Sequence, residues 1–136
     1  MAKKSKKIDY FYSVGRRKSA SARARVFRGK GESSVNGLEV AKYFPGEVLK
    51  SVYLKPFRVL DVSDKFYFTV KVVGGGKRGQ ADAVAHSLAK ALNKADKSFR
   101  TELKKAGLLT RDQRTRERRK VGTGGKARRK KQSPKR

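Results

Sequence analysis

The chain has 136 residues and carries 38 Lys or Arg against 11 Asp or Glu, a formal net charge of +27 at pH 7. So strong a positive field predicts a polyanionic partner, nucleic acid before any other. The chain has no cysteine, which excludes disulfides, thiolate zinc sites, iron-sulfur clusters and cysteine nucleophiles.

Length and charge predict one small domain with two basic extensions. Residues 1–7 form a basic N-terminal extension, residues 8–109 have the apolar content of a single core, and residues 110–136 form a basic arm. The arm holds 13 Lys or Arg against 2 acids, and residues 1–109 keep a net charge of +16, so the folded part is basic too. An arm so charged and so poor in apolar residues is expected to become ordered only against its partner.

The N-terminal sequence predicts a soluble protein that is not exported. Residues 1–7 are followed by Ile8-Asp9-Tyr10 instead of an apolar signal core, and no run of about 18 apolar residues occurs. We therefore expect no membrane contact, and we expect no homo-oligomer.

Three strands are predicted in the first part of the chain. Residues 8–14 are rich in aromatic side chains and are followed by Gly15, where the strand is expected to stop. Residues 34–37 are predicted as a short strand that runs into a turn. Residues 19–28 alternate: one face would carry Ala20, Ala22, Ala24 and Val26, and the other Ser21, Arg23, Arg25 and Phe27.

The rest of the chain alternates between helical and strand periods. Residues 40–54 have helical spacing, with Pro45 separating two short helices and Pro56 ending the second. Residues 57–60 and 66–73 are predicted as strands. A long amphipathic helix is predicted over residues 80–95, lying across the sheet, and a shorter one over 97–106 ending at Gly107. Thr110 with Gln113 would cap one more short helix before the arm.

Two motifs are suited to phosphate contact. Residues 13–19 place three successive cations at a connection between strands, an arrangement that favours binding to a nucleic-acid backbone over a merely solvated turn in so basic a chain. Gly74, Gly76 and Gly79 have the spacing of a dinucleotide fingerprint, but no second strand completes such a unit and no P-loop Ser or Thr follows Lys77. The glycines are expected to let the backbone approach a phosphate at a helix N-terminus.

No enzyme, metal or cofactor signature is present. His86, the single histidine, falls on the polar side of the predicted helix with Asp82 one turn before it, a placement typical of a surface or interface residue. The carboxylates are too dispersed to form a metal site or a catalytic cluster. Most aromatic residues are expected in the core, with Phe11 and Tyr67 as the candidates for exposure and base stacking.

The chain resembles a known family over residues 10–136. Six motifs occur in order: Gly15-Arg16-Arg17-Lys18-Ser19, Val35-Asn36-Gly37, Gly74-Gly75-Gly76 with Gly79-Gln80, Lys104-Lys105-Ala106-Gly107-Leu108-Leu109-Thr110-Arg111-Asp112, Glu117-Arg118-Arg119-Lys120 and Lys126-Ala127-Arg128-Arg129. In these motifs the chain is similar to the bacterial form of the ninth small-subunit ribosomal protein.

The resemblance implies a fold and a function. The fold would be α+β, a mixed sheet covered by helices like the second domain of the fifth small-subunit ribosomal protein. The function would be that of a non-enzymatic component of the small ribosomal subunit, bound to ribosomal RNA of the head and beside other head proteins. It would act in the cytoplasm or in an organelle, with its basic arm reaching the transfer RNA in the peptidyl site.

The expected site residues follow from the motifs and the resemblance. The ribosomal RNA contacts are expected at Arg16, Arg17, Lys18, Arg23, Arg25, Lys77, Arg78, Arg111, Arg114, Arg118, Arg119, Lys120, Lys126, Arg128 and Arg129. Close backbone approach to phosphate is expected at Gly74, Gly75, Gly76 and Gly79. Lys135 and Arg136 would lie near the transfer RNA.

Two other function classes remain as alternatives. A DNA-compacting protein would share the charge and the arm, and it would prefer duplex DNA to structured RNA at matched salt. A nucleotide-dependent enzyme would rest on the glycines after Val73, and it would lose saturable nucleotide binding on Gly76→Val. We place the enzyme last.

Overall fold

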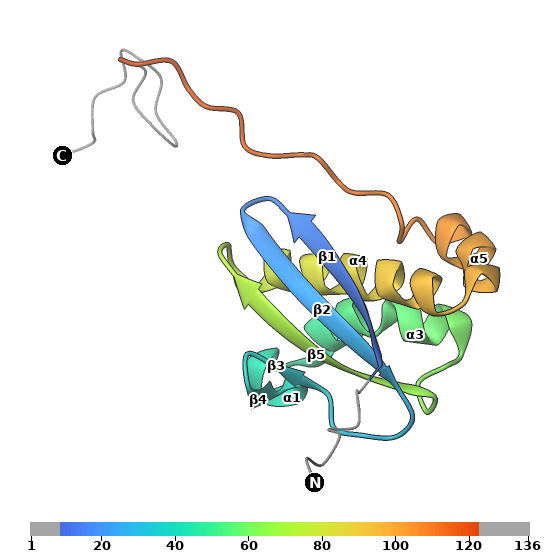
Figure 1. Ribbon diagram of the computed structural model, residues 1–136. Helices are drawn as coiled ribbons and strands as arrows, with labels where there is room; N and C mark the ends of the chain where they lie inside the picture. The colour runs from blue at the N-terminus through green and yellow to red at the C-terminus, as the bar shows by residue number, and fades with distance from the viewer. Residues whose placement is uncertain (1–8, 123–136) are drawn as a thin grey trace, which may run out of the picture.

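The computed structural model describes residues 9–122 and shows an α+β fold (Figure 1). The strands are β1 (Tyr10–Arg17), β2 (Ala20–Arg28), β3 (Ser34–Val35), β4 (Leu38–Glu39) and β5 (Phe66–Val73). The helices are α1 (Val40–Tyr43), α2 (Glu47–Tyr53), α3 (Lys55–Leu60), α4 (Lys77–Ala95), the short 3-10 helix η1 (Lys97–Phe99) and α5 (Arg100–Lys105).

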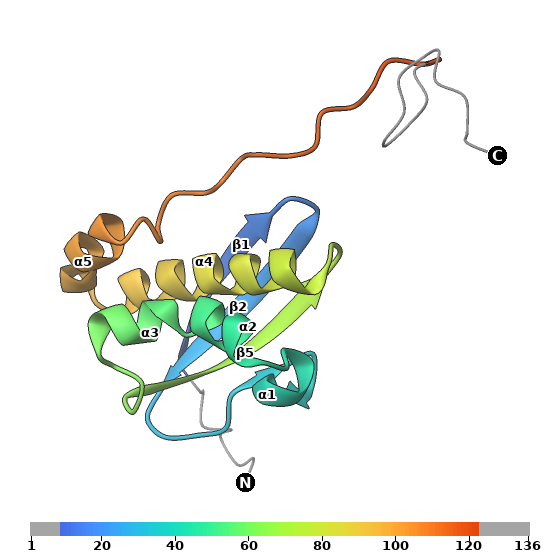
Figure 2. The same ribbon diagram turned by 180° about the vertical axis from the view of Figure 1, so that it is seen from behind.

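The strands form one mixed sheet with helices on one side. The order is β1-β2-β5-β3-β4; β3 runs parallel to β5, and the other neighbours are antiparallel. Helix α4 lies across β1 and β2, with α2 and α3 on the same side of the sheet (Figure 2). Within residues 9–122 no helix covers the opposite face of β1, β2 and β5, which we call the open face (Figure 1).

The core lies between α4 and the sheet, where the predicted alternation places it. Ala22, Ala24 and Val26 of β2 are fully buried, and their neighbours Arg23 and Arg25 are exposed on the open face. The buried stripe of α4 consists mostly of Ala, Val and Leu, so small side chains on both surfaces allow close packing. The strand over 66–73 and the long helix are therefore confirmed, although the helix begins earlier, at Lys77.

The edge strand β1 is fastened to α4 by lysines. Lys90 Nζ donates to the Val14 carbonyl oxygen at 2.9 Å, and Lys94 Nζ donates to the Tyr12 carbonyl oxygen at 2.7 Å. Carbonyl groups at the edge of a sheet otherwise stay available to foreign strands. These two lysines therefore join helix α4 to the edge strand of the sheet.

Asn36 extends the short parallel pairing of β3 with β5. Its backbone N–H donates to Val70 O at 2.8 Å, and its side-chain amide exchanges two hydrogen bonds with the backbone of Val72, at 3.0 and 2.8 Å. The side-chain amide thus makes the two hydrogen bonds to β5 that the backbone of one further residue of β3 would make. The predicted short strand and turn over 34–37 are confirmed, with Asn36 in a left-handed conformation, φ 51°.

Two predicted boundaries are wrong. Residues 57–60 are not a strand but part of α3, and Pro56 lies in the first turn of that helix instead of only ending the one before. Proline suits a first helical turn because its fixed φ matches the helix. The N–H that it lacks would have no hydrogen-bond acceptor within the helix there. Gly15 does not end β1, which continues to Arg17. A short segment such as residues 57–60 can form either a helix or a strand, and a single glycine can lie inside a strand. The tertiary contacts of each segment decide which structure forms.

Candidate nucleic-acid interface

The two glycine-containing motifs predicted to meet phosphate lie side by side at one end of the sheet. Ser21 of β2 pairs with Val73 of β5, so the glycine loop (Gly74–Gly76) runs beside the β1–β2 turn (Lys18–Ser19). A Cβ on Gly74 would lie 2.5 Å from the Ser19 carbonyl oxygen, and φ at Gly74 is 76°. Glycine is therefore required there for two independent reasons, space and backbone conformation.

Gln80 fixes the shape of the glycine loop. Its amide nitrogen donates to the Gly74 carbonyl oxygen at 3.0 Å, and its amide oxygen accepts from the Tyr43 hydroxyl at 2.9 Å. Gln80 lies in the first turns of α4 and is only 9% exposed, so the network is held within the fold. The sequence did not reveal this role, because Tyr43 lies 37 residues from Gln80 in the chain and comes near it only in the fold.

At the end of β1 and in the β1–β2 turn, Arg16 and Lys18 face solvent and Arg17 faces inward. Arg16 and Lys18 are exposed, and Lys18 has a left-handed φ of 53°. Arg17 alternates to the α4 side, where its side chain is 15% exposed. The three successive cations therefore divide between a solvent-facing pair and one internal group.

Arg17 ties the start of the arm to the body. Its Nη1 lies 3.1 Å from Asp112 Oδ1 and donates to the Arg114 carbonyl oxygen at 3.2 Å. Its Nε lies 3.8 Å from Asp82 Oδ2 on α4, and Arg78 Nε lies at the same distance from that oxygen. Its guanidinium thus joins β1, α4 and the arm, a structural role that sequence did not reveal.

The predicted capping-box helix after Thr110 does not form. Within the described residues the chain from 111 to 120 has no helix, and Asp112 accepts hydrogen bonds from the backbone N–H and the guanidinium of Arg114. The guanidinium and then the backbone bonds from Arg114 lower the pKa of Asp112 to about 2. A segment with successive cations and no apolar face has nothing to stabilise a helix.

Two basic hollows lie where the arm leaves the body. The first, about 460 Å³, lies between β1, α2, α4 and the arm; its charged lining residues are Arg16, Arg17, Lys55, Arg78, Arg114, Asp82 and Asp112. The second, about 780 Å³, lies between the β1–β2 turn and the arm; its lining residues are Arg17, Lys18, Ser19, Arg114, Thr115 and Arg116. Among residues 9–122 no carboxylate lines the second hollow, so the charge of its lining suits an anion.

The remaining predicted cations of the body lie outside these hollows. Lys77 Nζ is 3.4 Å from the centre of the Tyr43 ring, so this lysine makes a cation–π contact toward α1. Arg23 and Arg25 are exposed on the open face, as predicted. The structure therefore gathers the side chains of Arg16, Lys18 and Arg78 around the hollows at one end of the sheet. The Lys77 side chain turns from there toward α1, and Arg23 and Arg25 lie on the open face.

The aromatic prediction is half wrong. Phe11 pairs across the sheet with Val26, which places it on the helix side, where it is half-buried against the core. Tyr10 and Tyr12, its neighbours, are 46% and 42% exposed instead. Tyr67 is on the open face but half-buried. The strand register, which sequence does not show, decides which alternate set faces solvent.

His86 is a half-buried interface residue. Its Nε2 lies 3.3 Å from the Leu109 carbonyl oxygen and so carries the proton of that hydrogen bond, while its buried Nδ1 has no partner among the described residues. Burial lowers its pKa below the usual 6.5, and the charges of Lys90 and Arg111 lower it further, against the effect of the bond to Leu109. No nucleophile or carboxylate hydrogen-bonds to it in residues 9–122.

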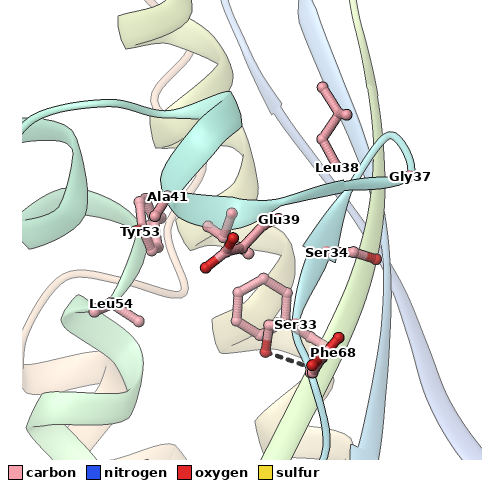
Figure 3. Close-up of a pocket in the computed structure, with 11 residues that line it drawn as sticks. Ser33, Ser34, Gly37, Leu38, Glu39, Ala41, Tyr53, Leu54 and Phe68 are labelled. Carbon is pink, nitrogen blue, oxygen red and sulfur yellow. Dashed lines mark hydrogen bonds between the residues drawn. The ribbon is translucent and has the colours of Figure 1, made fainter.

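A third hollow has the wrong chemistry for a polyanion. It measures about 600 Å³ and lies between the β3–β4 hairpin, α1 and the end of α2 (Figure 3). Glu32 and Glu39 are its charged lining residues, together with apolar groups such as Leu38 and Leu54. Ser33 Oγ at its edge accepts from the Phe68 backbone N–H at 3.3 Å, which holds the loop before β3 against β5.

The arm is described only in part. Arg111, Arg114, Arg118, Arg119 and Lys120 are exposed along the described stretch, which leads away from the body (Figure 1). Lys126, Arg128, Arg129, Lys135 and Arg136 lie outside the described residues. In residues 9–122 no group of three or more acidic or histidine side chains is placed to hold a metal ion, and no helix there is long and apolar enough to cross a membrane.

Comparison with known proteins gives a consistent result. The family model described as ribosomal protein S9/S16 matches residues 15–136. A small ribosomal subunit protein uS9 of Desulfovibrio desulfuricans is 45% identical over 111 residues, covering 82% of this chain and 85% of the relative. The uS9 protein of Maridesulfovibrio salexigens is 44% identical over 117 residues, covering 86% of this chain and 90% of the relative.

Proposed function

The chain belongs to the ribosomal protein S9/S16 family, and on that basis we propose how it works in the ribosome. It is a structural constituent of the small ribosomal subunit and not an enzyme. In our proposal the globular unit, residues 8–109, binds ribosomal RNA of the subunit head, and the arm, residues 110–136, threads through RNA. Lys135 and Arg136 approach the transfer RNA in the peptidyl site.

One observation carries the RNA-binding proposal: the β1–β2 turn, the glycine loop and the root of the arm meet at one end of the sheet. The register of β2 with β5 and the ion pair between Arg17 and Asp112 bring these three segments together. Solvent-facing Arg16 and Lys18 border basic hollows there, and the exposed glycines of the loop carry no side chain that would keep a phosphate away from the backbone. Such a surface recognises phosphate and shape instead of base sequence.

The proposed roles of the cations differ by position. Arg16, Lys18 and Arg78 clamp phosphates at the end of the sheet, and Arg23 and Arg25 contact RNA over the open face. Arg17 serves the RNA site indirectly by holding the arm, and Lys77 extends the basic surface toward α1. Along the arm, the arginines bond phosphates in bidentate fashion, an arrangement that a lysine does not reproduce.

We also propose a fold type, protein partners, a location and a reach for the arm, and the family and the charge of the chain support them. We assign the fold to the type found in the second domain of the fifth small-subunit ribosomal protein. Antiparallel strands β1, β2 and β5, the parallel strand β3 beside β5, and α4 across β1 and β2 support this assignment. Neighbouring head proteins are the protein partners, and the ribosome of the cytoplasm is the location. Fully extended, the arm's 27 residues span about 90 Å, enough to pass from a peripheral domain to an interior site.

Replacing the clamp tests the proposal. In small subunits assembled with Arg16→Ala, Lys18→Ala and Arg78→Ala combined, we expect release of the protein at lower salt than wild type. Removing three charge-assisted bonds to phosphate, at about 1 kcal/mol each, weakens binding on the order of a hundredfold. Gradient sedimentation at stepwise raised salt measures the release.

The matched control removes equal charge elsewhere. Lys30→Ala, Lys65→Ala and Lys104→Ala change three exposed cations outside the basic hollows, two of them at the far end of the sheet. This variant should stay bound like wild type. Equal release of the two triple variants would mean that net charge alone, and not the clamp, retains the protein.

A further inference from the structure

The open face carries a hollow beside Arg23 and Arg25, the two cations that the function proposed above sets against RNA. It measures about 240 Å³ and is bounded by Tyr12 of β1, Arg23 and Arg25 of β2, Lys71 of β5 and the β3–β4 hairpin. The strand register makes these side chains neighbours, because Tyr12 pairs with Arg25 and Arg23 pairs with Lys71. Residues paired directly across antiparallel strands project on the same face within contact distance.

The charge of this hollow is of one sign. Arg23, Arg25 and Lys71 supply three cations, and in the described part of the chain no carboxylate lines the hollow. Within residues 9–122 none of these cations forms a salt bridge. Thr69, which pairs with Arg25, adds a hydroxyl to the lining. The hollow is therefore equipped for an anion that also carries hydrogen-bonding groups.

Tyr12 is the aromatic ring available to a ligand here. The Tyr67 ring is stacked on Phe27, with centroids 5.0 Å apart, and Gly31 covers it so closely that a Cβ there would lie 2.9 Å from the ring. The Tyr10 ring lies under the Arg25 guanidinium, 5.0 Å from its centroid. Tyr12, 42% exposed, has no ring or cation contact in the described part of the chain.

The geometry points to a binding site for one unpaired nucleotide of single-stranded RNA, its base stacked on Tyr12 and its phosphate held by Arg23, Arg25 and Lys71. This inference rests on the proposed RNA-binding function and adds a ligand class to one surface. A base that is free of its duplex offers a face to an aromatic ring, whereas a paired base is already stacked on its neighbours. Unpaired RNA is therefore the occupant favoured over duplex.

The test compares two substitutions of Tyr12 in the full chain. Anisotropy of a short labelled oligoadenylate and of a labelled RNA duplex is measured at moderate salt for wild type, Tyr12→Leu and Tyr12→Phe. We expect Tyr12→Leu to bind oligoadenylate about tenfold more weakly, because the base no longer has a ring to stack on. Tyr12→Phe keeps the ring and should bind like wild type, and duplex affinity should be equal for all three.

A photochemical measurement locates the base directly. An oligonucleotide containing 4-thiouridine is irradiated with the wild-type chain, and the cross-linked peptide is identified by mass spectrometry; we expect Tyr12 among the modified residues. Equal affinities of all three proteins, or cross-links confined to the arm, would overturn the nucleotide site and leave general RNA binding intact. Wild type that binds neither RNA would instead overturn the proposed function itself.

Discussion

Gly15 lets the backbone of α4 pack closely on β1. A Cβ at this position would collide with the Ala83 carbonyl oxygen and lie 2.5 Å from the Ser87 backbone nitrogen. Both atoms belong to the backbone of α4, which cannot move aside as a flexible side chain could. The helix would have to move away from the sheet and loosen a core that is otherwise closely packed.

We therefore expect Gly15→Ala to lower the free energy of unfolding by about 1–3 kcal/mol, as overpacking of a closed core does. Urea denaturation followed by circular dichroism measures the change. Gly79→Ala is the control: its Cβ would meet only the Arg17 carbonyl oxygen at 3.7 Å and Ala20 Cβ at 3.9 Å. This control should gain about 0.5–1 kcal/mol from helix propensity. A stable Gly15→Ala protein would show that α4 packs more loosely than the structure has it.

At the scale of elements, His86 holds the segment after α5 against α4. Its Nε2–H donates to the Leu109 carbonyl oxygen, just before the arm begins. Added protons must go to Nδ1, which is buried without a partner among residues 9–122 and lies near the charges of Lys90 and Arg111. Burial, the largest cause, accordingly lowers the pKa of His86 from its usual 6.5.

The lowered pKa gives stability a definite pH dependence. Near pH 6.5 the unfolded chain binds a proton that the folded chain takes up only at lower pH. The free energy of unfolding should therefore fall as the pH falls through 6.5. One group limits the slope to about 1.4 kcal/mol per pH unit. Urea denaturation at several pH values measures it. His86→Gln, which cannot titrate, should remove the slope, and an unchanged slope would contradict this assignment.

At the scale of the whole molecule, a fixed body presents a long basic arm. Arg17 and Asp112 fasten the root of the arm beside the β1–β2 turn, and the described part beyond it runs outward (Figure 1). In the function that we propose, the body decides where the protein binds and the last residues contact transfer RNA at a distance from it. Assembly and transfer RNA contact should therefore be separable.

Neutralising the proposed transfer RNA contact tests that separation. Small subunits carrying Lys135→Gln with Arg136→Gln should assemble normally but hold peptidyl-site transfer RNA roughly fivefold less tightly for each charge removed, about 1 kcal/mol. Filter binding of labelled transfer RNA measures this. Lys135→Arg with Arg136→Lys preserves charge and length and should bind as wild type does. Normal binding by the neutral variant would mean that these two residues do not hold transfer RNA.

Local pattern and total charge were enough to predict a large part of this protein. The alternation over 19–28 placed Ala22 and Val26 inward and the arginines between them outward, and the helical stripe over 80–95 identified α4. The charge of +27 indicated a polyanionic partner, and the ordered motifs pointed to the family. Side-chain period and net charge are properties of the chain itself, so they need no knowledge of its fold.

Which distant residues meet became known only from the folded arrangement. The register of β1 on β2 turned Phe11 inward and left Tyr12 exposed, and the pairing of β2 with β5 brought the glycine loop to the β1–β2 turn. Residues 57–60 belong to a helix whose residues Pro56 and Phe57 are buried in the fold. Arg17 is an internal ion-pair partner of Asp112 at the root of the arm, and not a solvent-facing cation. Register and burial are set by contacts between segments far apart in the chain, and a local pattern carries no information about them.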